Sequence, residues 1–112
     1  MIKEKFKVYE LVSNEGLTNE AASSLHQVAE QLHSMILLVF TRYKFKVHDL
    51  EKLRTLTGSI EPEFLSAFPE SSPFECSCFE LLRQAYVDSR HAPGYAITVE
   101  QLNWLAGRIR HF

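Results

Sequence analysis

Three polar side chains recur inside an otherwise apolar stretch early in the chain: His26, Glu30 and His33. On a helix, at about 100° per residue, they fall within about 60° of one another and share one stripe. Histidine and glutamate in such a stripe can form an ion pair, hold a metal ion or transfer a proton. Because charged groups in an apolar helix are unfavourable unless they are paired or used, we expect function near this stripe.

The spacing Glu30-x-x-His33 matches half of a di-iron carboxylate site in a helical bundle. Such a site needs a second Glu-x-x-His and further carboxylates, whereas a later segment offers only Glu80-x-x-Arg83. We therefore expect no metal and no other cofactor. A glutamate buried against an arginine, with histidines at the helix edge, is the better interpretation of the stripe.

A second polar group comprises Arg83, Tyr86 and Arg90. Residues seven apart on a helix point within about 20° of one another, so the two arginines form a pair on one side. A guanidinium is a rigid fork of donors that suits a carboxylate or a phosphate. The arginines therefore either pair with Glu30 or bind a ligand, and the two interpretations are compatible.

Apolar residues spaced three and four apart predict the helices that carry these groups. The first helix ends before Gly16, and the second starts at a Thr18 cap and continues for about two dozen residues, the full length of a small bundle. The third begins near His48 and Asp49 and stops at Gly58. Residues 59–71 then form a connector, in which a helical turn is expected at Phe64, Leu65 and Phe68.

Two capping boxes mark the starts of the last two helices, at Ser72-Pro73-Phe74-Glu75 and at Thr98-Val99-Glu100-Gln101. The fourth helix is expected to run to about Arg90, because Pro93-Gly94 follows it. No strand pattern appears. Short links make consecutive helices neighbours, so we predict an all-α, antiparallel up-and-down bundle of about five helices in a single domain, residues 1–112.

Composition limits the function classes. The formal net charge of -2 argues against broad attraction to nucleic acid, so any such contact must use a local patch, at 42–48 or at 108–111. Cys76 and Cys78 project about 200° apart on a helix, so a disulfide between them is not expected. The longest apolar run, 35–40, is too short to span a membrane, and we expect a cytoplasmic protein without membrane contact.

Three segments resemble, in order, motifs of the HEPN family (higher eukaryotes and prokaryotes nucleotide-binding). They are His26-Gln27-x-x-Glu30, His48-Asp49-Leu50 and Ala85-Tyr86-x-x-x-Arg90-His91, the last continued by Asp88 to Thr98. The resemblance extends from about Gly16 to the C-terminus. Members of this family are small helical domains that occur beside minimal nucleotidyltransferases, as RNase toxins of toxin–antitoxin pairs and as nucleotide-binding modules.

This resemblance implies a prokaryotic homodimer that binds a nucleotide, RNA or a nucleotidyltransferase partner. The implied groove is lined by six residues: His26, Glu30, Arg83, Tyr86, Arg90 and Tyr95. On this interpretation the arginines contact phosphate. Without the family resemblance, these residues imply only that the two arginines contact a carboxylate or a ligand.

The sequence departs from the active members of the family. HEPN ribonucleases carry Arg-x(4 to 6)-His near the fourth helix, with arginine holding phosphate and histidine assisting transfer of the 2′-hydroxyl. Here seven residues separate Arg83 from His91, and the matching pair Arg42 and His48 lies at a helix junction. We therefore expect a non-catalytic module. Two alternatives stay open: a metal-independent endoribonuclease of toxin type that uses Arg90 and His91, and a protein-interaction domain without a ligand.

Overall fold

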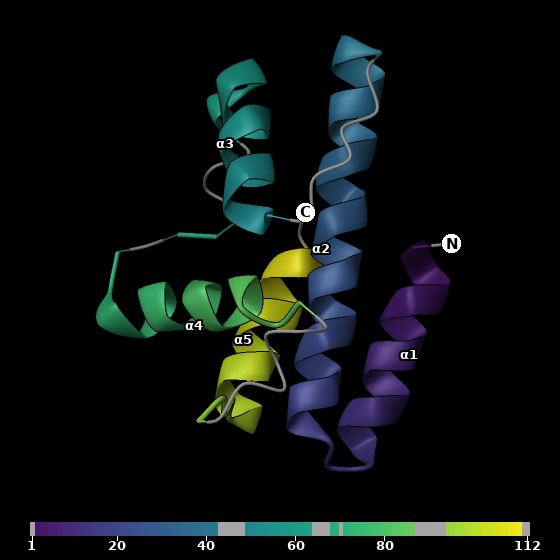
Figure 1. Cartoon of the computed structure of the whole chain (residues 1–112), viewed down its shortest axis with the longest axis vertical. Helices are drawn as coiled ribbons and strands as arrows, with labels where there is room; N and C mark the ends of the chain where they lie inside the picture. The colour runs from purple at the N-terminus through teal and green to yellow at the C-terminus, as the bar shows by residue number, and fades with distance from the viewer. Residues whose placement is uncertain (1, 43–48, 64–67, 70, 87–93, 111–112) are drawn as a thin grey trace.

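The computed structural model describes residues 2–42, 49–63, 68–69, 71–86 and 94–110, and these ranges contain five helices and no strand (Figure 1). In chain order the helices are α1 (Ile2–Asn14), α2 (Thr18–Thr41), α3 (Leu50–Ile60), α4 (Pro73–Arg83) and α5 (Val99–Arg110). The predicted all-α class is confirmed. Within the described ranges, no helix is both long enough and apolar enough to cross a membrane.

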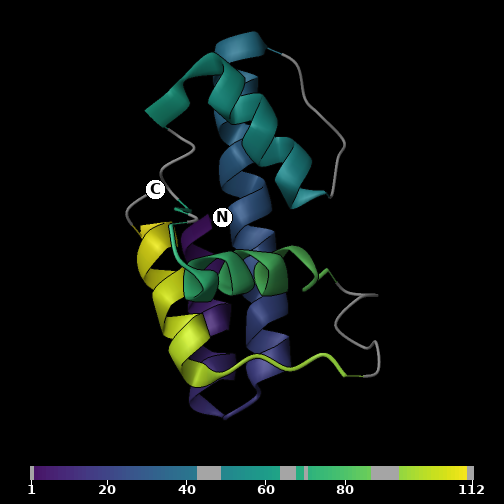
Figure 2. The same cartoon turned by 90° about the vertical axis from the view of Figure 1, so that its left-hand side faces the viewer.

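The long helix α2 is the element on which the others assemble. Its 24 residues extend for about 36 Å, and α1, α3, α4 and α5 all contact it. The shorter α1 returns antiparallel along the part of α2 that adjoins their connecting turn (Figure 1). In two perpendicular views α4 lies across α2, and α5 packs against both (Figures 1 and 2). The crossing places the last turn of α4 against one side of α2.

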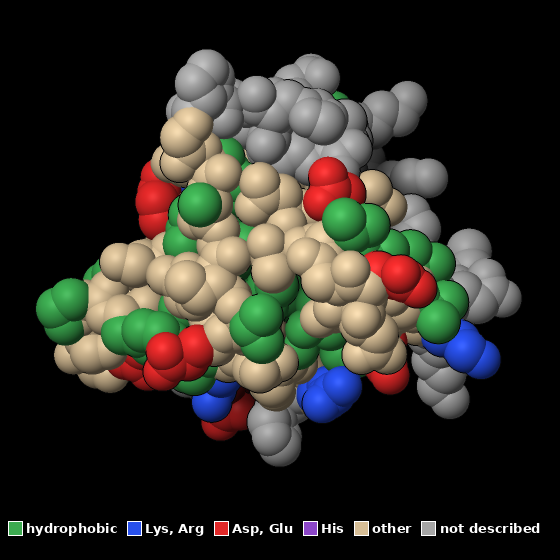
Figure 3. All heavy atoms as spheres, turned by 90° about the horizontal axis from the view of Figure 1, so that it is seen from below, with side chains coloured by type: hydrophobic (Ala, Val, Ile, Leu, Met, Phe, Trp, Pro, Cys, Tyr) green, Lys and Arg blue, Asp and Glu red, His purple; other side chains and the backbone are tan. Residues whose placement is uncertain are grey.

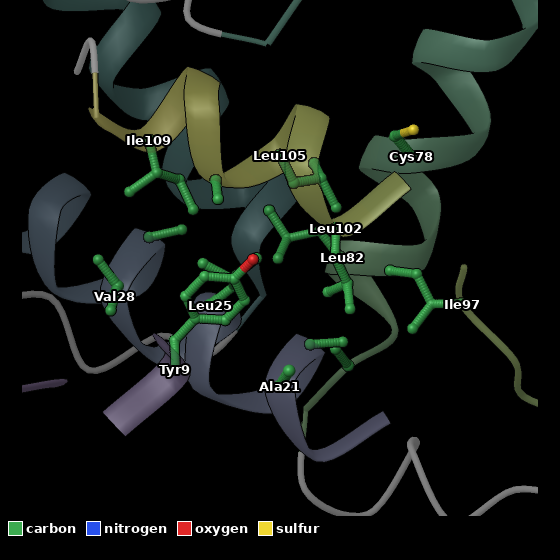
Figure 4. Packing of buried hydrophobic residues seen from close by; sticks show 14 of the residues in the cluster. Tyr9, Ala21, Leu25, Val28, Cys78, Leu82, Ile97, Leu102, Leu105 and Ile109 are labelled. Atoms are coloured by element: carbon green, nitrogen blue, oxygen red, sulfur yellow. The ribbon is translucent and has the colours of Figure 1, made fainter. Parts of the chain in front are cut away.

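One apolar core joins α1, α2, α4 and α5 (Figure 4). Its buried members include Tyr9 from α1, Leu25 from α2, Leu82 from α4 and Leu105 from α5. Removal of a side chain of this size from water contributes about 1.5–3 kcal/mol. The apolar residues that recur at helical spacing in the sequence are therefore the side chains of this core. Their packing fixes where α2 and α4 meet.

The predicted helix starts are confirmed where a side chain caps the helix. Ser72 accepts a hydrogen bond from Glu75 N, and Thr98 and Gln101 bond reciprocally, as a capping box requires. Asp49 caps α3 in the same way. Thr18 was expected as a cap, and this is wrong by one residue: Leu17 holds the cap position and no side chain caps α2 there.

Two predicted helix ends are also wrong. The helix α3 does not stop at Gly58 but continues to Ile60, with Gly58 buried inside it and Glu61 N still bonded to Thr57 O. The helix α4 ends at Arg83 rather than near Arg90. The turn expected at Phe64 and Leu65, and the stop at Pro93, lie outside the described residues.

Candidate functional site

His26 lies at the junction of α2 and α4 and is almost completely buried. Its Nδ1 donates a hydrogen bond to the carbonyl oxygen of Leu82 at 2.9 Å, and its Nε2 lies 3.0 Å from Glu30 Oε2. A carbonyl oxygen only accepts, so Nδ1 carries a proton. The stripe predicted on α2 therefore exists, and two of its members, His26 and Glu30, are paired.

The contact with Leu82 also explains why α4 ends early. Leu82 O accepts from Ala85 N at 3.1 Å as well as from His26, so this carbonyl is satisfied by a tight turn and by a side chain of α2 where α4 ends. One residue earlier, Leu81 O accepts from the hydroxyl of Tyr95 at 2.7 Å. Side chains from two other segments thus satisfy carbonyls that a helix end leaves without partners.

His26 and Glu30 form the polar edge of this junction. Nδ1 of His26 faces the carbonyl end of α4, and Nε2 faces the Glu30 carboxylate. Glu30 keeps a side-chain exposure of 17%, so the carboxylate forms the accessible edge of the pair.

Tyr86 is the aromatic member of the site. Its ring centroid lies 5.9 Å from that of His26, and 37% of the residue is exposed. The structure therefore brings His26, Glu30 and Tyr86 together at one place. The Glu30 carboxylate offers a hydrogen-bond acceptor and the exposed ring of Tyr86 offers a stacking surface, both beside His26.

Arg83 and Tyr95 have other principal contacts. Arg83 Nε donates to Glu80 Oε2 at 3.0 Å, and Glu51 Oε2 of α3 lies 3.9 Å from the same nitrogen. This hydrogen bond to the Glu80 carboxylate raises the pKa of the Arg83 guanidinium. Because α4 ends at Arg83, the helical spacing that would align it with Arg90 is not present. Tyr95 turns its hydroxyl to Leu81, and burial raises the pKa of Tyr95 to about 12.

His33, the third member of the polar stripe on α2, belongs to a separate cluster. Its Nδ1 donates to Ala29 O at 2.7 Å, and its ring stacks on Phe68 with centroids 6.2 Å apart. Burial lowers the pKa of His33, and the nearby charge of Arg54 lowers it further. Glu30 contacts His26, whereas His33 contacts Ala29 and Phe68. The spacing Glu30-x-x-His33 therefore does not form half of a di-iron site in this fold. No group of three or more His, Cys, Asp or Glu that could hold a metal occurs in the described part of the chain.

Sequence reasoning missed Arg54. Its Nη2 donates to Phe68 O at 3.0 Å, and its guanidinium lies 5.1 Å above the ring centre of Phe79. These contacts join α3 and the connector to α4. One feature of the sequence could have indicated them: Arg54 follows Leu53 and precedes Leu56, two members of the leucine stripe of α3.

Several predicted residues lie outside the described ranges: Arg90, His91, His48 and the basic patch from Tyr43 onward, and His111. Of the C-terminal patch, Arg110 is described, and its guanidinium lies 5.0 Å above the ring of Phe6. The end of the molecule with the α1–α2 turn presents acidic and apolar side chains more widely than basic ones (Figure 3). That face is therefore a poor surface for a phosphate backbone.

Comparisons with known proteins add no family to this geometry. No protein-family model and no curated protein sequence matches the chain.

Proposed function

We propose that this chain is a non-catalytic, HEPN-like module that binds a nucleotide or single-stranded RNA at His26, Glu30 and Tyr86. The observation that carries the proposal is the contact of buried His26 with the partly exposed carboxylate of Glu30, beside the exposed ring of Tyr86. Such a polar pair contributes little net stability compared with apolar packing, so its placement at a partly exposed site favours a binding role.

The contacts of His26 favour binding over catalysis at this place. A general base needs a nitrogen lone pair that can reach the substrate proton. Nδ1 of His26 is bonded to Leu82 O and Nε2 faces Glu30, so both nitrogens are already engaged. His33 is likewise buried and stacked on Phe68. Neither described histidine is therefore placed to transfer a proton from a ribose hydroxyl.

Each remaining group suits one part of a nucleotide. The ring of Tyr86 can stack on a base, and the Glu30 carboxylate can accept hydrogen bonds from a base amino group or a ribose hydroxyl. Arg83, three residues before Tyr86, donates from Nε and Nη2 to Glu80, so a phosphate competes with that carboxylate for the guanidinium. The module is therefore expected to bind base and sugar through Tyr86 and Glu30, and to gain phosphate affinity where Arg83 leaves Glu80.

Fluorescence anisotropy with a labelled single-stranded RNA of about 10 nucleotides tests the proposal. Tyr86→Ala should weaken binding roughly tenfold, because stacking on one base contributes about 1–3 kcal/mol. Glu80→Gln should strengthen binding and Arg83→Ala should weaken it, with affinity falling as salt rises. Phe74→Ala is the matched control, because Phe74 is as exposed as Tyr86 and lies at the opposite end of α4.

Gel analysis of the same RNA separates the proposal from its alternatives. Intact RNA after hours of incubation, with and without chelator, supports a binding module. Cleavage that is lost in Arg90→Ala and His91→Ala, with folding retained, would replace it by the toxin-type ribonuclease. Absence of binding in the unmodified chain would favour the protein-interaction domain.

A further inference from the structure

The helix α3 is attached to the molecule differently from the other helices. It packs on the half of α2 that lies farther from the α1–α2 turn (Figures 1 and 2). It contributes Leu50 to the core that joins α1, α2, α4 and α5, whereas Leu53 of α3 and Leu37 of α2 are buried but are not members of that core. A helix with this smaller share in the main core can open at a lower free energy than the whole fold.

An ionisable ring lies within this attachment. His33 of α2 is completely buried, and its ring is stacked on Phe68 with an angle of 15° between the two planes. Arg54 of α3 donates a hydrogen bond to Phe68 O, and its guanidinium lies over the ring of Phe79 in α4. Phe68 is therefore held from both sides, by His33 of α2 and by Arg54 of α3.

The surroundings of His33 favour its neutral form. Burial has the largest effect and lowers the pKa of His33, and the positive charge of Arg54 on α3 lowers it further. Carboxylates on the three helices contact other groups: Glu30 of α2 contacts His26, and Glu51 of α3 and Glu80 of α4 both contact Arg83. A second proton on the His33 ring therefore adds a cation beside a cation inside the protein.

We propose that α3, together with Phe68, is a pH-sensitive unit that opens from α2 when His33 is protonated, while the core of α1, α2, α4 and α5 stays folded. Opening hydrates the His33 ring and separates it from Arg54, so the open form binds the proton more readily than the closed form. The closed form is therefore favoured above about pH 6.5, and the open form gains population as the pH falls below that value. The inference does not involve the residues of the ligand site.

Hydrogen exchange resolved by peptide, at about pH 7.5 and about pH 5.5, tests the proposal, with exchange times scaled for the intrinsic rates. Protection of α3 should fall about tenfold relative to that of α5, because the lower pH is about one unit below the ordinary pKa of histidine. Unchanged protection of α3, or an equal fall in α3 and α5, overturns the proposal.

Variants of His33 identify the group that responds to pH. His33→Phe keeps an aromatic ring against Phe68 and removes the titration, so the ratio of α3 to α5 protection should stay within about twofold between the two pH values. His33→Gln is a second variant without titration, and circular dichroism verifies that each variant folds. Lys52→Gln is the matched control, because it removes an exposed cation of α3 and should keep the full tenfold fall. A full fall in a folded His33 variant overturns the proposal.

Discussion

His26 of α2 donates its Nδ1 proton to the carbonyl oxygen of Leu82, 56 residues later in the chain and at the end of α4. The same ring contacts Glu30 through its other nitrogen. One side chain thus joins the end of one helix to a carboxylate on another. Changes at this junction should therefore affect the stability of the fold as well as ligand binding.

Glu30→Ala should lower the free energy of unfolding by about 1–3 kcal/mol, because a buried imidazole loses its charged partner. Urea unfolding followed by the fluorescence of Trp104 measures the change. Glu10→Ala, at an exposed position on α1, is the control and should stay within about 0.5 kcal/mol of the unmodified chain. A loss below that value for Glu30→Ala would show that the pair is solvated.

Tyr95→Phe should cost about 1 kcal/mol, because Leu81 O loses its donor without a change in side-chain volume. Burial raises the pKa of Tyr95 to about 12, above the value near 10 of an unfolded tyrosine. The neutral phenol is therefore favoured in the folded state, and its contribution is complete below about pH 10 and falls as pH rises towards 12. Ultraviolet titration should lose its highest-pH tyrosine step in this variant, and retention of that step would contradict the assignment.

His33 should make the fold less stable in acid. Its pKa is lowered by burial, so the unfolded chain binds a proton more readily, and stability falls as pH drops below about 6.5. The slope contributed by one such group is at most about 1.4 kcal/mol per pH unit. Urea unfolding at several pH values between about 7.5 and 5.5 should show a smaller loss for His33→Gln than for the unmodified chain. An equal loss in both would assign acid sensitivity to other groups.

The two cysteines should differ sharply in reactivity. Cys76 is exposed, whereas Cys78 is buried and burial raises its pKa to about 11. The thiolate is the reactive form, so an aromatic disulfide reagent at about pH 8 should label one thiol per folded chain and both after unfolding. Cys76→Ser should abolish the fast reaction and Cys78→Ser should preserve it. Rapid labelling of both thiols in the folded chain would show that α4 opens readily.

The sequence could predict features that depend on neighbouring residues. The caps at Ser72 and Thr98 bond to backbone groups three residues away, so a short pattern identifies them. The end of α4 depends instead on His26 and Tyr95, which no local pattern connects to Leu82 or Leu81. The candidate site divides in the same way. The stripe with His26 and Glu30 was predictable from helical spacing on one helix. The contact expected between Arg83 and Glu30 joins two helices, and the bond of Arg83 to Glu80 competes with it.

The side-chain closure of α4 also bears on the order of folding. A helix closed by a glycine can complete its end as soon as the local turn forms. Two acceptors of the last turn of α4 also bond to α2 and to the segment before α5, so we expect this turn to become stable only when those elements are in place. Native-state hydrogen exchange should therefore show the end of α4 opening together with the segment around Tyr95, as one cooperative unit and not as a fraying helix terminus.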